Sequence, residues 1–280
     1  MSLSLARARA LIGERWFGDG DPRYARRLRL GALVIALWLS TEVDLRYAHL
    51  PKGATVSLLG LALPATFWSS AAARWGAKIA LWVGAALWLR GLARRWAAVT
   101  AVLGMWVLGS IYWENLPWFR HKFVAPLWVL VLLAAAEFRP GCAPRWLREG
   151  ATLVLAAFYG GAGIAKLAGS GLAWADGVGL QLWMLRLGDP ESVVRRWILA
   201  DARLARACAS AALTLELAAI LLVFSPRLRR PVGALILALH AGIDAIFHID
   251  FRPQMLLVAL VLLPAATPRS SACMKPESAS

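Results

Sequence analysis

The chain has 280 residues, of which 60% are hydrophobic and only 17% charged, whereas soluble domains average about 25% charged residues. Its net charge is +15, but the arginines crowd short loops between apolar blocks, where basic residues set membrane orientation. This pattern argues against a soluble enzyme and against nucleic acid as a partner, because no separate basic stripe with interleaved aromatic residues is present.

The first segment, residues 1–28, is polar and rich in arginine, with a minority of apolar side chains. No apolar stretch followed by a small-residue cleavage site occurs there, so the segment does not resemble a signal peptide. We expect a basic, amphipathic segment on the cytoplasmic membrane surface. Residues 29–268 form the expected transmembrane domain, and residues 269–280 a disordered tail.

Within the transmembrane domain, apolar blocks of roughly 17–22 residues match the length of a helix that crosses a bilayer. We predict an all-α integral membrane protein, a polytopic bundle of about eight transmembrane helices. The predicted spans are 29–47, 77–93, 96–114, 121–138, 150–168, 206–225, 231–248 and 252–267.

Two stretches do not fit a simple span. Residues 55–68 are apolar but short and contain Pro64, so they favour a re-entrant or interfacial segment. The loop 169–205 is predicted to hold one helix at about 176–187 and another at about 190–203. The second helix would begin at Asp189-Pro190-Glu191, where an acidic N-cap precedes a proline at the first helical position.

The orientation follows from the basic loops. One short loop contains Arg90, Arg94 and Arg95, and a second contains the arginines of residues 227–230. Both loops fall on the same side of the membrane as the basic N-terminus. Short basic loops face the cytoplasm, so both chain ends are predicted inside a multi-pass protein of the cell membrane. If residues 55–68 do cross the membrane, the later loops invert.

In this arrangement the ionisable residues gather toward the outer side. A charge at the centre of a bilayer costs at least about 2.5–3.5 kcal/mol, so such residues are functional candidates. Asn115 and Glu114 end one span there, His121 opens the next, and Lys166 ends the fifth.

His240, Asp244 and His248 follow one another at four-residue spacing in the seventh span, which places them on one helical face. Two histidines and one aspartate on a single helix would need further metal ligands from elsewhere, so no metal site is predicted. A proton-handling face and a structural polar face both remain open. Cys142 and Cys208 form no CxxC pair with each other or with Cys273, which gives no sign of a zinc site or a disulfide framework.

Lys166 lies in a glycine-rich turn of the fifth span, after Gly160 and Gly163, which permit close helix contact. A desolvated lysine can lose its proton and act as a base. The alternative is a lysine that extends its ammonium to the outer headgroups. Glu216 lies deep in an apolar run, where it either pairs with a Lys, Arg or His or is protonated.

The segment 158–177, FYGGAGIAKLAGSGLAWADG, resembles a signature of the horizontally transferred transmembrane (HTTM) family, which includes the membrane part of vitamin K-dependent gamma-carboxylases. In that signature a Gly-x-x-Lys-Leu turn is followed by a Trp-x-x-Gly segment. The matching residues are Gly163, Lys166, Leu167, Trp174 and Gly177. Three further residues follow the order of the family. They are His121, a histidine that opens a helix, Glu216, a glutamate in an apolar helix, and His240, a later histidine.

This resemblance implies that Lys166 is a base acting on a hydroquinone and that His121 assists it at the quinone. The implied pocket is apolar and outward-facing. Its predicted lining comprises Asn115, Trp174, Glu216, His240, Asp244 and His248.

The chain departs from those carboxylases in two ways. It shows no counterpart of the large substrate domain that follows their membrane part, and it has Ala165-Lys166 where they carry two adjacent lysines. Carboxylation of a protein substrate is therefore not expected.

Two main hypotheses remain. The first is a membrane enzyme that handles a quinone or a similar lipid-soluble redox substrate. The second is a non-catalytic, DoxX-like membrane accessory that works with a redox partner protein. A proton-coupled transporter ranks third, because an inverted internal repeat is not found in the sequence.

Overall fold

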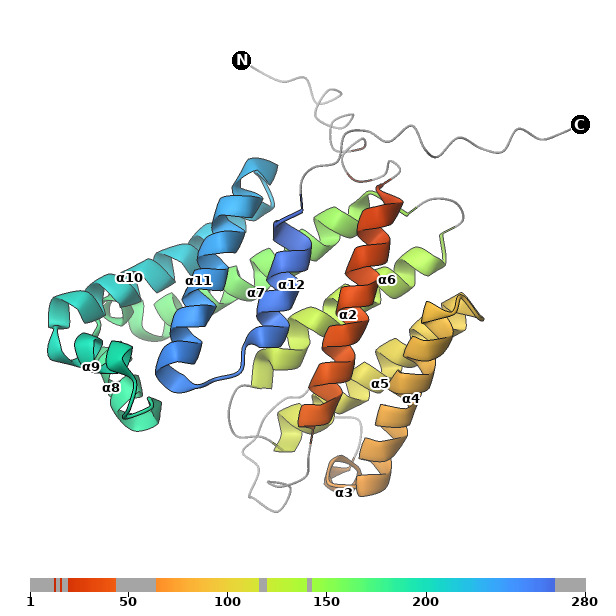
Figure 1. Ribbon diagram of the computed structural model, residues 1–280, viewed down its shortest axis with the longest axis horizontal. Helices are drawn as coiled ribbons and strands as arrows, with labels where there is room; N and C mark the ends of the chain where they lie inside the picture. The colour runs from red at the N-terminus through yellow and green to blue at the C-terminus, as the bar shows by residue number, and fades with distance from the viewer. Residues whose placement is uncertain are drawn as a thin grey trace, which may run out of the picture. The chain divides into compact units, whose positions relative to one another are not determined.

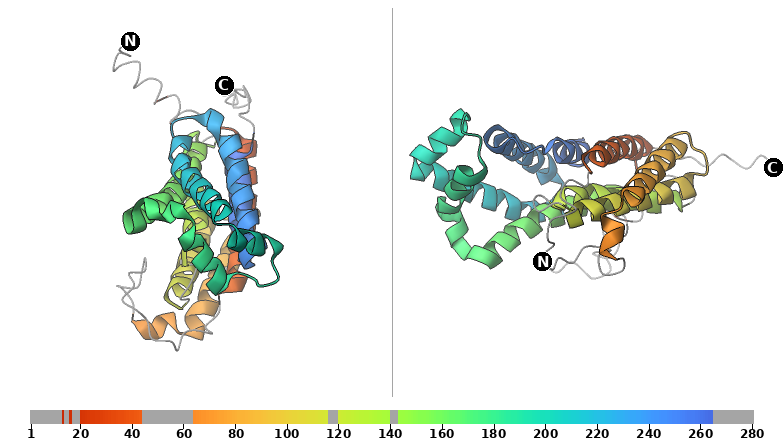
Figure 2. Two further views of the ribbon diagram at one scale, coloured as in Figure 1. Left: turned by 90° about the vertical axis from the view of Figure 1, so that its left-hand side faces the viewer. Right: turned by 90° about the horizontal axis from the view of Figure 1, so that it is seen from below.

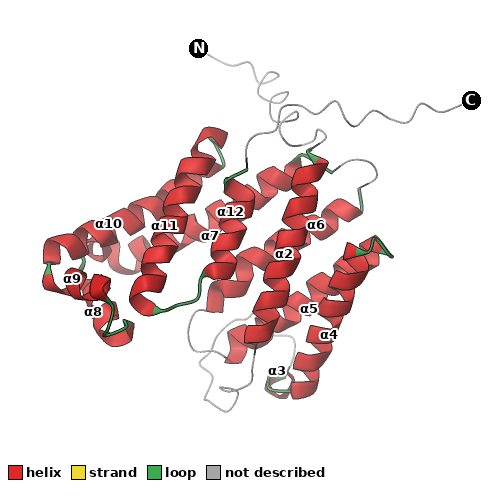
Figure 3. Ribbon diagram, in the orientation of Figure 1, coloured by secondary structure: helices red, strands yellow, loops and turns green. Residues whose placement is uncertain are grey.

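The structure is a computed structural model, and it describes residues 13, 16, 20–43, 64–115, 120–139 and 143–264. These residues form helices joined by short turns, and no strand occurs among them (Figure 3). The all-α prediction is therefore confirmed for the described residues. The chain divides into an N-terminal unit that runs to Ala151 and a C-terminal unit from Thr152 to Pro264.

In the N-terminal unit, the described residues form five α-helices, a 3-10 turn and the beginning of a long helix (Figure 1). They are α2 (Pro22–Glu42), α3 (Ala65–Trp68), α4 (Ala71–Leu89), α5 (Arg94–Asn115), η1 (Arg120–Phe123), α6 (Val124–Glu137) and the first part of α7 (Trp146–Ser170). Helix α2 begins at Pro22, seven residues before the predicted span. The cause is a good N-terminus: Asp21 accepts a hydrogen bond from the Arg23 backbone, and Pro22 needs no hydrogen-bond acceptor.

Helices α4 and α5 form an antiparallel pair, which both views of Figure 2 show in orange and yellow. A side chain at Gly84 would meet the Ala101 nitrogen at 2.6 Å, and one at Gly104 would meet the Leu81 nitrogen at 2.5 Å. The two backbones can therefore approach closely, as in membrane helix pairs with small residues at their contact.

The C-terminal unit takes up the rest of α7 and the elements that follow it. They are η2 (Gly171–Asp176), α8 (Val178–Leu187), α9 (Val193–Ala200), α10 (Ala202–Ala218), η3 (Ala219–Leu222), η4 (Pro226–Leu228), α11 (Arg229–Phe247) and α12 (Arg252–Leu262). Met184, Ile198, Ala205 and Ile246 form a small buried core that joins α8, α9, α10 and α11.

The two helices predicted in the loop are present, but the start of the second was misplaced. Helix α9 is capped by Ser192, whose hydroxyl accepts from the Arg195 nitrogen. Asp189 instead accepts from the Glu191 nitrogen, and its own nitrogen binds the Ile246 carbonyl. The prediction failed because this longer-range hydrogen bond holds Asp189 in the preceding turn.

Among the described residues, four helical segments are long and apolar enough to cross a membrane: Arg94–Asn115, Trp146–Asp176, Ala202–Leu222 and Pro226–Phe247. In the apolar stretch of the third segment only 22% of the residues are buried, and in that stretch of the fourth segment only 28% are buried. Apolar side chains exposed on this scale are compatible with a protein surrounded by lipid. The four candidate membrane-spanning segments therefore fit an integral membrane protein.

Each of the eight predicted spans overlaps a helix, yet the count of eight crossings remains a prediction. Helices α6 and α12 have 14 and 11 residues, whereas a helix that crosses a bilayer needs about 20 residues. Most of the segment 55–68 lies outside the described residues, as do the tail 269–280 and nearly all of residues 1–19.

Candidate functional site

The fifth predicted span corresponds to α7, and one face of this helix carries Tyr159, Gly163 and Lys166. These positions follow one another at intervals of four and three residues, so their side chains point to the same side. All three belong to the C-terminal unit. The candidate site is built on this face of α7, which carries the glycine and the lysine of the Gly-x-x-Lys-Leu turn.

Lys166 forms an ion pair with the Oε1 atom of Glu216 on α10, and its ammonium lies 5.1 Å from the centre of the Trp174 ring. The side chains are 24% and 10% exposed, respectively, for Lys166 and Glu216. The other Glu216 oxygen, Oε2, is buried and accepts no hydrogen bond from the residues that the structure describes. Lys166 is thus held between a carboxylate and an aromatic face, two groups that attract a cation.

Glycines on α7 decide how near α10 comes. A side-chain carbon at Gly163 would lie 3.2 Å from the Glu216 Cβ, and one at Gly160 would lie 2.5 Å from Ile220 Cγ1. The absence of side chains at both positions lets α10 pack close enough for Glu216 to reach Lys166. The glycines of the signature therefore have a direct physical role in forming the ion pair.

Gly177 explains the Trp-x-x-Gly part of the signature. Its φ of +88° is a conformation that favours glycine, and a side chain there would meet the Arg206 nitrogen at 2.4 Å. The turn after Trp174 can therefore pack directly against the start of α10. This packing keeps the indole of Trp174 beside Lys166.

A second polar contact lies further along the same face of α7. The Tyr159 hydroxyl and His240 Nε2 on α11 are 2.7 Å apart, and both side chains are buried. The His240 ring lies 4.7 Å from that of Phe251, centre to centre.

Asp244 and His248 do not share the environment of His240. Asp244 is exposed, and His248 ends α11 as its C-cap in a left-handed conformation with φ +48°. His248 Nε2 lies 2.8 Å from Asp189 Oδ2 in the loop before α9. The prediction of a single face for all three was wrong at His248, because the helix ends at Phe247.

The Asp189 carboxylate lies in a loop outside the candidate spans. The Glu191 backbone N–H lowers the pKa of Asp189 below its ordinary value of 3.8, and the hydrogen bond with His248 lowers it further. This contact joins the loop to the end of α11.

Asn115 and His121 belong to the N-terminal unit. The buried Asn115 amide donates to the carbonyls of Trp68, at 2.7 Å, and Ile111, at 2.9 Å, which ties the end of α5 to α3. His121 lies in η1, and its side chain is outside the described part of the structure. A pocket that unites either residue with Lys166 remains a prediction.

Two residues of these contacts, Tyr159 and Asp189, were not among the predicted site residues. Tyr159 could have been found, because it lies on the helical face of Gly163 and Lys166 and ends an aromatic pair with Phe158. Asp189 was identified as a helix cap, and its contact with His248, 59 residues away, left no local signal.

Comparisons of the chain with family models, with curated proteins and with solved structures gave no match.

Proposed function

We propose that this integral membrane protein binds a lipid-soluble quinone or hydroquinone and that Lys166 acts as the base toward it. The observation that carries the proposal is the Lys166–Glu216 ion pair, formed by two candidate membrane-spanning segments and covered by the Trp174 ring. A flat, apolar substrate enters such a site from the bilayer and meets a few polar groups there. The resemblance to the HTTM signature at these residues supports the same assignment.

The ion pair provides a route for the proton. When the ammonium passes its proton to Glu216, a neutral amine and a neutral acid remain, and no charges are separated. The amine of Lys166 then takes a proton from a hydroxyl group of the hydroquinone, which leaves an ammonium beside the hydroquinone anion. The cation stabilises this anion in a surrounding of low dielectric. The role that the family resemblance implies for His121 stays a prediction.

Binding is tested by loading the purified protein with a quinone, removing excess ligand, and measuring the retained quinone by solvent extraction and mass spectrometry. Lys166→Met removes a charged hydrogen-bond donor, which should weaken retention by about tenfold or more. Arg203→Gln, an exposed position on α10, is the matched control and should retain quinone normally. Equal retention by the Lys166→Met variant would contradict the proposal.

The role of Lys166 as base is tested separately with Lys166→Arg. An arginine keeps the positive charge and can pair with Glu216, but its guanidinium does not give up its proton. The variant should therefore bind quinone and yet fail to form the hydroquinone anion, whose absorbance is followed after mixing. Anion formation at the native rate would show that Lys166 is not the base.

A second candidate function, a non-catalytic DoxX-like accessory to a redox partner, is favoured by the same ion pair for another reason. Lys166 and Glu216 hold α7 against α10, which is a sufficient structural role. In that case Lys166→Met destabilises the protein by about 3 kcal/mol, because it leaves Glu216 buried without a partner. A Lys166→Met/Glu216→Met double variant would recover most of this loss, quinone retention would not change, and a redox protein would co-purify.

The topology proposed with this function places the protein in the cell membrane, with both chain ends in the cytoplasm. The short basic loops support it, through the general preference of arginine and lysine for the cytoplasmic side.

A further inference from the structure

Two short helices, α8 and α9, lie between the candidate spans Trp146–Asp176 and Ala202–Leu222. Helix α8 has 10 residues and α9 has 8. At about 1.5 Å per residue, neither helix is long enough to cross a hydrocarbon core of about 30 Å. Figure 1 shows both of them at the end of the C-terminal unit where α10 begins and α11 ends.

The two helices form a folded pair rather than a loose connection. The Gln181 side-chain amide on α8 donates to the Ile198 carbonyl on α9 at 3.0 Å, and Arg195 Nε on α9 donates to the Met184 carbonyl on α8 at 2.9 Å. Met184 and Ile198 are also buried in the small core that they share with α10 and α11. One side of the pair is therefore fixed, and the side chains on the other side are exposed in a defined arrangement.

Hydrogen bonds attach the pair to the end of a third candidate span. The Asp189 nitrogen, between α8 and α9, donates to the Ile246 carbonyl at 2.9 Å, and the Ser192 hydroxyl donates to the Ala245 carbonyl at 2.7 Å. Both carbonyls belong to the last turn of α11, where the candidate span Pro226–Phe247 ends. The pair is thus attached to the ends of three candidate spans, two through the chain itself and one through these hydrogen bonds. Where those spans cross a bilayer, the pair lies at its surface.

The exposed face of α8 is apolar. Val178, Leu182 and Leu185 follow one another at intervals of four and three residues, so their side chains share a face. All three are exposed, and Leu182 is 61% exposed. Arg186 lies one turn after Leu182 and is also exposed. A row of exposed apolar side chains on a helix that is packed on its other side indicates contact with an apolar partner.

Helix α9 has an exposed face of the same kind. Val193 and Trp197 lie four residues apart on one face, and Trp197 is 64% exposed. Arg196 is exposed next to Trp197 in the chain. An indole is favoured at the boundary between hydrocarbon and water, and an arginine can lay its apolar stem on lipid while its guanidinium reaches the phosphates. The side chains of this face therefore fit the headgroup level of a bilayer.

We propose that α8 and α9 form an interfacial anchor that lies in the headgroup layer of the membrane. Leu182, Leu185 and Trp197 enter the lipid, and Arg186 and Arg196 face the phosphates. The bilayer is favoured over a second protein because the ends of three candidate spans hold the pair where lipid is already present. The anchor rests on the membrane-spanning role of these segments and is independent of the chemistry proposed for Lys166.

The experiment measures the depth of single nitroxide labels on the full-length protein in liposomes of phosphatidylcholine and phosphatidylglycerol. In a background in which the three native cysteines are replaced by serine, the label is attached through Leu182→Cys or through Trp197→Cys. Electron paramagnetic resonance compares collisions of the label with oxygen, which dissolves in lipid, and with a nickel chelate, which stays in water. Both labels should lie about 5–10 Å below the phosphates, the depth of an interfacial helix.

Two control labels mark the limits of this scale. Glu191→Cys, exposed between the two helices, should collide mainly with the nickel chelate. Leu235→Cys, exposed near the middle of the candidate span Pro226–Phe247, should lie deeper than either anchor label. If an anchor variant fails to fold, as judged by gel filtration in detergent, Leu185→Cys or Val193→Cys on the same face takes its place.

Three results would overturn the proposal. Anchor labels as accessible to the nickel chelate as the label at Glu191→Cys would place the helices in water. Low accessibility to both reagents would show that protein covers these faces, either another part of this chain or a second molecule. A depth equal to that of Leu235→Cys would place the pair inside the hydrocarbon core rather than at its boundary.

Discussion

At the scale of single residues, two lysine–glutamate pairs illustrate how surroundings decide function. Lys122 and Glu42 are 3.0 Å apart in the N-terminal unit, and Lys166 pairs with Glu216 in the C-terminal unit. Each glutamate has one buried oxygen that accepts no hydrogen bond among the described residues. Lys166 differs in having an aromatic ring at its ammonium and in pairing with a residue of another candidate membrane-spanning segment. These two features make the second pair the better candidate for proton transfer.

A pH prediction belongs to Asp189. Its pKa is lowered in the folded protein, so the charged carboxylate stabilises the fold above the ordinary value of 3.8. This contribution is lost as the pH falls through the lower pKa of the folded state. Thermal unfolding followed from neutral to acidic pH should therefore show a smaller loss of stability on acidification in Asp189→Asn than in the native protein.

Glu191→Gln is the matched control for this measurement, because its backbone N–H still donates to Asp189. Its acid limb should follow that of the native protein. If Asp189→Asn also follows the native acid limb, Asp189 has no role in the pH dependence.

At the scale of the elements, helix contacts rather than helix propensities determine the site. Helix α10 approaches α7 at Gly160 and Gly163, and the turn at Gly177 packs on the start of α10. Each glycine removes an obstacle between two backbones, and together they bring Trp174 and Glu216 to Lys166. The same principle joins α4 and α5.

Gly160→Ala should test this helix contact. The added carbon would lie 2.5 Å from Ile220 Cγ1 in η3, directly after α10, so the Ile220 side chain or the backbone that carries it must shift away from α7, at a cost of about 1–3 kcal/mol. Quinone retention at Lys166 should fall with it. Thermal unfolding in detergent and the extraction assay measure the two effects.

Gly161→Ala provides the control one residue along the same helix. A side chain at this position meets no atom within 4 Å, so the change should be neutral or stabilise the helix by up to about 1 kcal/mol. An equal destabilisation of both variants would show that the close approach of α10 is not what matters.

At the scale of the whole molecule, the predicted orientation is open to a direct test by cysteine labelling. In a background in which Cys142, Cys208 and Cys273 are replaced by serine, single cysteines are placed at Leu92 and Arg227, both exposed positions in predicted inner turns. A membrane-impermeant maleimide should label neither in intact cells and both after the membrane is opened, because short basic turns face the cytoplasm.

Glu191→Cys, in the exposed loop before α9, should be labelled in intact cells. Labelling of Leu92→Cys and Glu191→Cys from the same side would reject the eight-span arrangement. That outcome would indicate an additional or a missing crossing between these two positions.

The sequence by itself determined the all-helical fold, the apolar blocks of membrane length and the approximate position of the helices that overlap the eight predicted spans, whereas the short helix α3 was not predicted. These properties follow from local composition: apolar blocks of membrane length and loops marked by arginine and proline. It also singled out Lys166 and its glycines, because a charge in an apolar helix is costly enough to be noticed without a structure.

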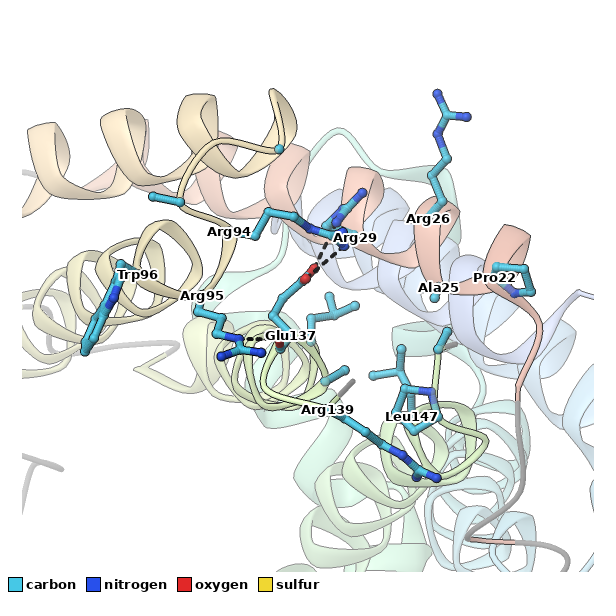
Figure 4. A pocket seen from close by; sticks show the side chains of 16 residues that line it. Pro22, Ala25, Arg26, Arg29, Arg94, Arg95, Trp96, Glu137, Arg139 and Leu147 are labelled. Carbon is cyan, nitrogen blue, oxygen red and sulfur yellow. Dashed lines mark hydrogen bonds and ion pairs between the residues drawn. The ribbon is translucent and has the colours of Figure 1, made fainter. Parts of the chain in front are cut away.

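The tertiary structure alone decided which partners these residues have. Glu216 lies 50 residues from Lys166, and His240 lies 81 residues from Tyr159, and no local pattern specifies either contact. His248 contacts Asp189 and does not share a helix face with His240, because α11 ends at Phe247, one residue before the end of the predicted span. A cavity in the N-terminal unit is a further example, because Arg26, Arg94 and Arg139, which lie in separate basic segments of the sequence, line the same cavity after folding (Figure 4).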